Sequence, residues 1–240
     1  MSKNINDPRR AFLVDALSIG LFASANVAGI FQASRAMGDI PSKLPPGRSI
    51  FRLEGSVTVD GKIADINTKI GPNSLIRTGP DSLIIFVVET DAFVLRANSE
   101  LKMKSSGLFI ESMRLLSGKI LSVFGTREKV HSISTSTATI GVRGTGIYIE
   151  SEPELSYVCT CYGHTRISAN ADPNITEDVV TKHHDRPLYI LPATGNSNLI
   201  VPAPVFNHTD IELSLIEELV GRKPPFAKFK GKKYDGSGFY

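Results

Sequence analysis

The chain has 240 residues, of which 41% are hydrophobic and 21% are charged, so it can bury one substantial core and is too apolar for a disordered protein. Its formal net charge of +3 is unevenly distributed. Residues 1–36 and 222–240 are basic, whereas residues 37–221 carry an excess of acidic groups. A nucleic-acid-binding domain normally presents a basic body, so the charge distribution argues against that class.

The first 36 residues have the pattern of a twin-arginine export signal. The pair Arg9-Arg10 precedes an apolar stretch over residues 17–31 that is diluted by serine, glycine and asparagine. A membrane-spanning helix needs about 20 predominantly apolar residues, so this stretch is better suited to a removable signal. The pattern predicts a periplasmic protein, and the alternative is a retained N-terminal anchor.

Residues 37–48 are proline-rich and are expected to form a linker. Short apolar segments separated by glycines follow, and this pattern predicts an all-β body. Residues 82–89 form a continuous apolar run, as expected for a strand covered on both faces. A sandwich, a barrel and a short solenoid all remain open. The other expected strands are residues 50–59, 92–96, 101–104, 108–112, 120–124 and 132–139.

A glycine-containing segment, Arg143-Gly144-Thr145-Gly146, is expected to form a bend before a strand at residues 147–149. Arg143 and Thr145 are candidates for contact with a ligand or a partner. The interpretation that we favour is structural: Arg143 is buried and its five fixed donors hold loop carbonyls, while Gly144 occupies a tight turn. Beyond this bend, residues 155–167 are expected to form a hairpin, with a polar loop at residues 170–178.

The C-terminal extension, residues 169–221, contains one expected helix at about residues 210–220. Thr209 and Glu212 have the spacing of a capping box, apolar residues then recur at helical spacing, and Gly221 is a natural stop. Residues 222–240 are basic and glycine-rich, so we expect a flexible tail. Its lysines and aromatic residues would suit a membrane or cell-wall surface, and a solvated tail is the alternative.

Taken in order, four segments resemble the FecR domain, a periplasmic all-β module. The resemblance covers residues 49–168. It implies a compact β-solenoid or sandwich-like fold that acts by binding or signalling and supplies no catalytic residues. The segments that carry it are residues 76–82 (Ile-Arg-Thr-Gly-Pro-Asp-Ser), 97–101 (Ala-Asn-Ser-Glu-Leu) and 115–120 (Leu-Leu-Ser-Gly-Lys-Ile), followed by Arg143-Gly144-Thr145.

Two cysteines and several histidines make the sharpest candidate site. Cys159 and Cys161 would project to one face of a strand, with His164 just past the expected turn. Of His183 and His184, at most one would face the cysteines if their segment is a strand. Two thiolates with one or two imidazoles suit zinc or copper, and haem iron is a third candidate. The alternatives are a disulfide, which would need a bulge or kink, or two free thiols in the core.

The sequence contains no glycine-rich phosphate loop, no Gly-x-Ser-x-Gly and no His-Glu-x-x-His motif. We therefore expect a non-catalytic, exported envelope protein that binds a protein or a small ligand, in a sensing or signalling role, and does not bind nucleic acid. The alternative function is a periplasmic metal-binding or redox protein that uses the cysteine–histidine residues. His208, beside the expected helix cap, could add a ligand to that site, or could simply form a hydrogen bond at the helix start.

Overall fold

The computed structural model describes residues 43–226, apart from residues 106, 127–129 and 194–197. The chain divides into two compact units, Met1–Ile40 and Pro41–Tyr240, and all the described residues belong to the second unit. The predicted export signal and most of the predicted tail lie outside the described residues. Within the part of the chain that the structure describes, no helix is both long and apolar enough to cross a membrane.

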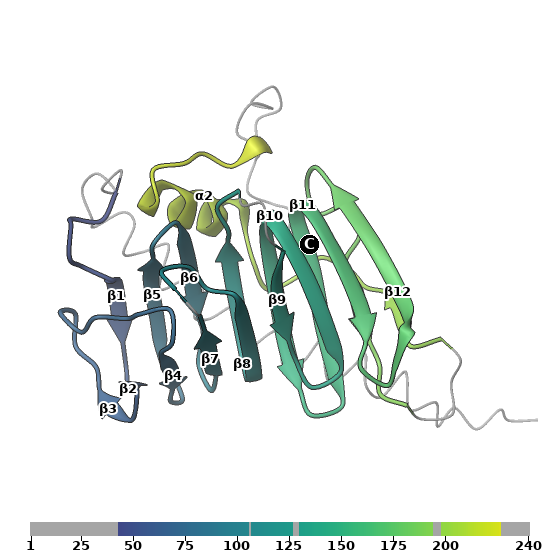
Figure 1. Cartoon of the computed structure of the whole chain (residues 1–240), viewed down its shortest axis with the longest axis horizontal. Coiled ribbons are helices and arrows are strands. Elements are labelled where there is room, and N and C mark those ends of the chain that lie inside the picture. Colours follow the sequence, from purple (N-terminus) through teal and green to yellow (C-terminus); the bar gives the residue numbers. More distant parts are fainter. Residues whose placement is uncertain (1–42, 106, 127–129, 194–197, 227–240) are drawn as a thin grey trace, which may run out of the picture. The chain divides into compact units, whose positions relative to one another are not determined.

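The described residues form one fourteen-stranded sheet and one α-helix, α2 (Asp210–Leu219) (Figure 1). This confirms the prediction of an all-β fold with a single C-terminal helix. The helix begins at the predicted capping box and ends one residue before the predicted boundary. The strands are β1 (Ile50–Glu54), β2 (Val57–Val59), β3 (Lys62–Ile63), β4 (Leu75–Thr78), β5 (Leu83–Val88), β6 (Asp91–Leu95), β7 (Glu100–Lys104), β8 (Ser112–Val123), β9 (His131–Ser134), β10 (Ala138–Glu152), β11 (Leu155–Ala169), β12 (Asp172–Thr181), β13 (Leu188–Ile190) and β14 (Ile200–Pro202).

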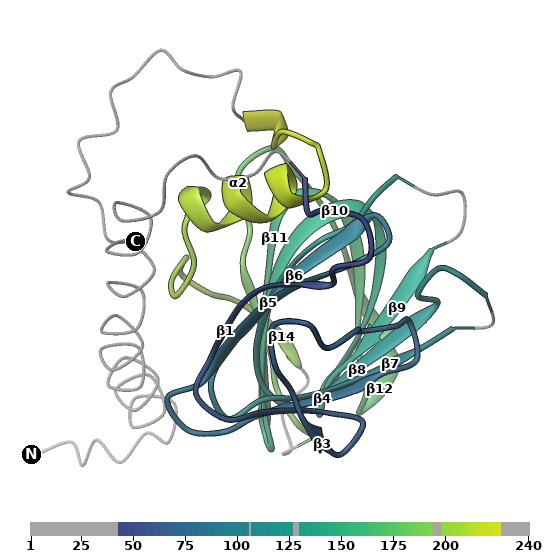
Figure 2. The same ribbon diagram turned by 90° about the vertical axis from the view of Figure 1, so that its left-hand side faces the viewer.

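The sheet is open and bends into two facing layers (Figure 2). The long strands β8, β10 and β11 belong to both layers, because their two halves pair with different neighbours. Each of them contains a glycine with positive φ, namely Gly118, Gly144 and Gly163, a backbone conformation that glycine adopts without steric cost. The main hydrophobic core lies between the layers and includes Phe86 and Phe93 from one side and Leu101 from the other.

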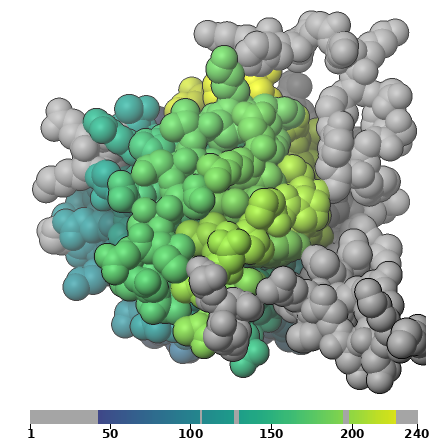
Figure 3. All heavy atoms as spheres, turned by 90° about the vertical axis from the view of Figure 1, so that its right-hand side faces the viewer, coloured from purple at the N-terminus to yellow at the C-terminus, as the bar shows by residue number. Residues whose placement is uncertain are grey.

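Helix α2 packs on the outer face of one layer, against β6 and β8 (Figure 2). The strands beneath it are therefore covered on both faces, and every residue of β6 is buried. β5, predicted from its continuous apolar run, is buried at five of its six positions. The segment between β14 and α2 also lies against the sheet (Figure 3): the Tyr157 hydroxyl donates to the Pro204 carbonyl at 2.9 Å, and the Ala203 N–H donates to the Pro187 carbonyl at 2.9 Å.

Three local predictions were wrong. Residues 155–167 do not form a hairpin but lie within the single strand β11, which Gly163 bends without reversing; the chain reverses at residues 153–154 and 170–171 instead. The expected polar loop at residues 170–178 is mostly strand β12, because its backbone pairs with β11. The expected strand at residues 108–112 is a loop as far as residue 111, and β8 begins only at Ser112.

Candidate metal centre

Cys159 and Cys161 lie at a β-bulge in β11. Tyr148 of β10 pairs with Cys159, whereas Gly146 pairs with Tyr162, so β11 contains an extra residue here. A bulge places two residues of one strand opposite one residue of its partner and redirects a side chain. Both cysteines are buried free thiols, and both lie near His208, the residue that precedes the N-cap of α2.

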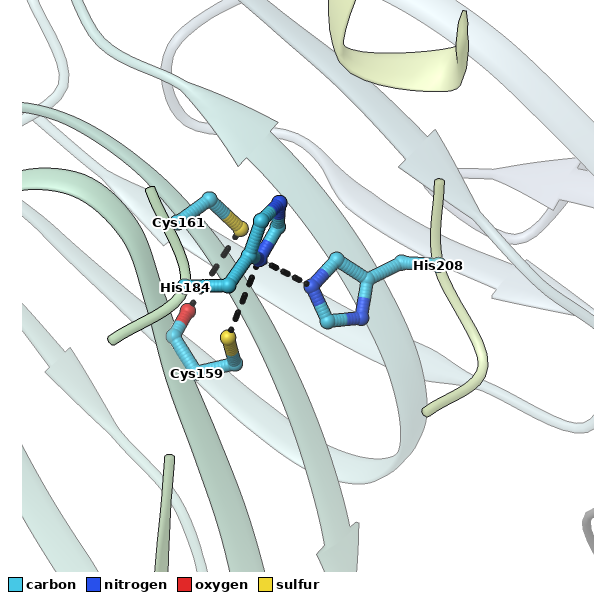
Figure 4. Close-up of side chains that lie close together, drawn as sticks. All are labelled: Cys159, Cys161, His184 and His208. Carbon is cyan, nitrogen blue, oxygen red and sulfur yellow. Dashed lines mark hydrogen bonds between the residues drawn. The ribbon is translucent and has the colours of Figure 1, made fainter. Parts of the chain in front are cut away.

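Two histidines from other parts of the chain meet these sulfurs (Figure 4). His184 lies in the turn after β12 with a φ of 51°, and its backbone N–H donates to the Cys161 carbonyl at 2.9 Å. His208 precedes α2, and its ring stacks on Tyr148 with 4.6 Å between centroids and 18° between planes. One donor atom from each of the four side chains lies within 4.8 Å of the others.

The two closest separations are near those of a tetrahedral metal site, and all four donor atoms lie within 4.8 Å of one another. The distance from Cys159 Sγ to His184 Nδ1 is 3.4 Å, and that from His208 Nε2 to His184 Nδ1 is 3.1 Å. Zinc–sulfur and zinc–nitrogen bond lengths place neighbouring ligand atoms of a tetrahedral site roughly 3.3–3.8 Å apart. The four residues therefore present two thiols and two imidazoles that one ion could bridge if the more distant donors moved closer together.

The outer nitrogen of each ring is held by an acceptor. His184 Nε2 lies 3.1 Å from Asp210 Oδ1, and His208 Nδ1 lies 2.7 Å from the Phe206 carbonyl oxygen. Neutral rings must carry their protons on these outer nitrogens, which leaves the lone pairs of His184 Nδ1 and His208 Nε2 facing each other. Two lone pairs at 3.1 Å repel, so the metal-free cluster needs a proton between these nitrogens, which the raised pKa of His184 favours, and a bound metal ion would take the place of that proton. Partners on the outer nitrogens are also the usual support of metal-binding histidines.

The electrostatics of the cluster favour a thiolate at Cys159. Burial opposes ionisation of this thiol, but hydrogen bonds from Cys161, His184 and His208 together with the charge of His208 hold its pKa well below the ordinary value. Burial and the adjacent Cys159 raise the pKa of Cys161. For His184, burial disfavours the charged ring, yet hydrogen bonds to Asp210 and Cys159 outweigh it and raise the pKa to about 9. A thiolate is the form of cysteine that binds metals.

Three of the five predicted ligands come together: Cys159, Cys161 and His184. Two do not. His164 Nε2 lies 3.2 Å from Asp178 Oδ1 and its side chain is half-exposed. His183 instead contacts the Asp210 carboxylate at 2.8 Å.

The histidine pair was expected to point to opposite faces only if its segment were a strand, and the structure shows a bend there instead. At most one histidine of the pair was expected to face the cysteines, and His184 does so. His208, which the sequence analysis considered as an additional ligand, completes the cluster in place of His164. The supporting carboxylate of Asp210 was not anticipated, although its position at the start of the predicted helix, two residues after His208, is a signal that could have identified it.

The residues of the Arg-Gly-Thr segment are separate from this cluster. Arg143 is exposed, so the expectation of a buried guanidinium was wrong. Thr145 is buried; its hydroxyl donates to the His164 carbonyl at 2.9 Å and its carbonyl accepts from the Phe124 N–H at 3.0 Å. The expected bend is a register shift in β10 at this point. Thr145 thus joins β10 to β11 and to the residue that follows β8.

No family model and no curated protein matches the chain, so membership of the FecR family stays a prediction. Two crystal structures of a candidate anti-sigma factor from Parabacteroides distasonis, at 1.65 and 2.50 Å resolution, are similar to it. In both cases the identity is 13%, the TM-score is 0.45, and the match covers 55% of this chain. The match spans 60% of the length of those chains. A likeness this distant carries no functional argument.

Proposed function

We propose that the protein is a non-catalytic binding protein of the bacterial envelope that holds a structural zinc ion at Cys159, Cys161, His184 and His208. The observation that carries this proposal is the cluster itself: four donors within 4.8 Å, with the outer nitrogens of both rings held by acceptors. A zinc site with four protein ligands leaves no open position for a substrate, which is typical of structural rather than catalytic sites.

Zinc suits this donor set better than the other ions considered. Two thiolates and two imidazoles in a roughly tetrahedral arrangement form one of the common structural zinc sites. Copper(I) shares the preference for thiolates, so elemental analysis must distinguish the two metals. Haem suits the cluster less well, because haem iron takes at most two axial protein ligands whereas four donors converge here within 4.8 Å.

The proposed cellular compartment, the bacterial envelope, is inferred from the sequence. The Arg9-Arg10 pattern indicates twin-arginine export, and the order of segments in residues 49–168 resembles a module that acts by binding. The twin-arginine route carries folded proteins, which suits a buried site that must be filled before export. The partner would be an envelope protein or a small ligand, and the mildly acidic body makes nucleic acid a poor candidate.

Elemental analysis of the full-length chain, purified under reducing conditions without chelator, tests the metal site. We expect about one zinc ion per chain, consistent with a closed four-ligand site. Cobalt(II) should replace zinc and give the visible absorption of tetrahedral thiolate ligation. The double variant Cys159→Ser/Cys161→Ser should lose the metal and the cobalt spectrum, because serine does not replace a thiolate ligand.

His164→Ala is the matched control, since His164 lies on the same strand as the cysteines and contacts Asp178 instead of the cluster. This variant should retain the metal at the wild-type ratio. Stoichiometric copper would change the metal assignment while leaving the site in place. A wild-type protein without stoichiometric metal, or a double cysteine variant that keeps it, would contradict the proposal.

A further inference from the structure

Of the four cluster residues, His208 alone belongs to the C-terminal segment, defined here as residues 203–222. Cys159 and Cys161 belong to β11, and His184 to the turn after β12. The C-terminal segment contributes no strand to the sheet. An ion held by all four residues would therefore join this segment to the sheet at one point, immediately before α2.

A second connection runs through His184. Metal binding at Nδ1 would fix this ring as the tautomer that donates from Nε2, and Nε2 lies 3.1 Å from Asp210 Oδ1. Asp210 is the first residue of α2. The same ion would thus hold the start of the helix twice, directly through His208 and indirectly through the His184–Asp210 hydrogen bond.

The remaining contacts of the C-terminal segment include several that are polar and buried. Arg96 of the body donates to Glu212 at 2.7 Å and to the Asn207 carbonyl at 2.9 Å. Glu217 accepts from Tyr162 and from Arg222. Buried ion pairs contribute little net stability because both charges lose their water. Within the described residues Arg96 Nε is buried without a partner, which further weakens this contact.

Helix α2 has only ten residues, and helices of this length are marginal by themselves in water. Its apolar contribution comes from buried residues on one side, among them Leu213, Ile216 and Leu219. The helix therefore depends on its contacts with the sheet for stability. His208 lies immediately before the N-cap of the helix, so an ion bound at the cluster would add a further attachment at the start of α2.

We propose that the metal ion controls docking of the C-terminal segment: bound metal holds α2 on the outer face of the sheet, and loss of metal releases it. This inference rests on the proposed zinc site. Release would expose the outer face of β6 and β8, which α2 covers in the docked state. The protein would then present a different surface to envelope partners according to whether the metal is bound.

Hydrogen–deuterium exchange of the full-length chain, followed by mass spectrometry, tests this inference. The zinc-loaded and chelator-treated proteins are compared over α2, with β5 in the sheet core as the internal reference. Removing the metal should increase exchange over α2 at least tenfold and leave β5 unchanged. Zinc-loaded His208→Ala should exchange over α2 like the metal-free protein, while His164→Ala should behave like the wild type.

Each outcome decides a different point. Absence of metal in the wild type contradicts the proposed function. Bound metal with unchanged α2 exchange on chelation overturns the inference alone, and so does an equal increase over α2 and β5, which would mean a global loss of stability. If chelation unfolds the sheet, as judged by circular dichroism, the zinc-loaded wild type and His208→Ala are compared instead. An increase confined to α2 then supports the inference, and no increase overturns it.

Discussion

At the scale of single residues, Gly146 makes the bulge beside the cluster sterically possible. It pairs with Tyr162, and a Cβ at this position would lie 2.4–2.9 Å from three atoms of the tyrosine ring. The Tyr162 hydroxyl donates to Glu217, so the ring is also held at its far end. We expect Gly146→Ala to destabilise the protein by about 1–3 kcal/mol through overpacking. It should also weaken zinc retention, because Cys161 precedes the displaced ring.

Urea unfolding and the zinc content of the purified variant measure these two effects. Gly71→Ala is the matched control, because a Cβ at Gly71 meets no atom within 4 Å and its φ lies outside the left-handed region. A Gly146→Ala protein with wild-type stability and wild-type zinc content would show that the bulge tolerates a larger neighbour.

The sequence predicted the site only in part. The spacing of Cys159 and Cys161 was enough to place both thiols on one side of β11. The sequence left open which of His183 and His184 would approach them, and the structure places His184 there. The sequence could not show that His164 lies outside the cluster. A register shift and the positive φ of Gly163 change the direction in which side chains point beyond the bulge. The position of His208 depends on long-range packing of the C-terminal segment, which no local pattern encodes.

At the scale of secondary structure elements, Glu212 has two functions in α2. One carboxylate oxygen completes the capping box with Thr209, and the other contacts Arg96 at 2.7 Å. The side chains of Arg96 and Glu212 are 8% and 1% exposed, so Glu212→Gln would remove the carboxylate partner of a buried guanidinium. We expect a loss of about 3–5 kcal/mol for Glu212→Gln. Thr209→Ala, which removes only the cap hydroxyl, should cost about 1 kcal/mol.

Chemical denaturation of the zinc-loaded variants compares the two losses. The double variant Arg96→Met/Glu212→Leu should recover much of the stability lost in Glu212→Gln, because neither buried charge then remains. If Glu212→Gln cost no more than Thr209→Ala, the ion pair with Arg96 would contribute nothing beyond the helix cap.

Local sequence patterns best predicted those elements whose ends are set by nearby residues in the chain. The capping box and Gly221 placed α2 within one residue of its observed end, and the apolar run at residues 82–89 placed β5. The long strands were missed for a physical reason. Gly144 and Gly163 indicate turns in a sequence, but in β10 and β11 they occur at bends within strands that continue into the second layer. Whether a glycine reverses a chain or only bends it depends on which partner strand is available.

At the scale of the whole molecule, the cluster bears on whether the protein folds before or after the predicted export. Two buried thiols would be exposed to oxidation if the chain crossed the membrane unfolded, since the bacterial periplasm favours disulfides. A chain that folds around zinc in the cytoplasm carries these thiols already bound. The twin-arginine pattern and the buried Cys159–Cys161 pair are therefore consistent with each other, although they lie in different parts of the chain.

This consistency gives the last prediction. The conservative double variant Arg9→Lys/Arg10→Lys keeps the charge of the signal but removes the arginine pair, so the protein should remain in the cytoplasm, folded and loaded with zinc. Replacing residues 1–36 by a signal for unfolded export should deliver a periplasmic protein with less zinc and with oxidised Cys159 and Cys161. Cell fractionation, thiol alkylation and elemental analysis measure the three properties. Unchanged periplasmic delivery of the arginine variant would contradict the export route, and full zinc content after unfolded export would separate metal loading from the route.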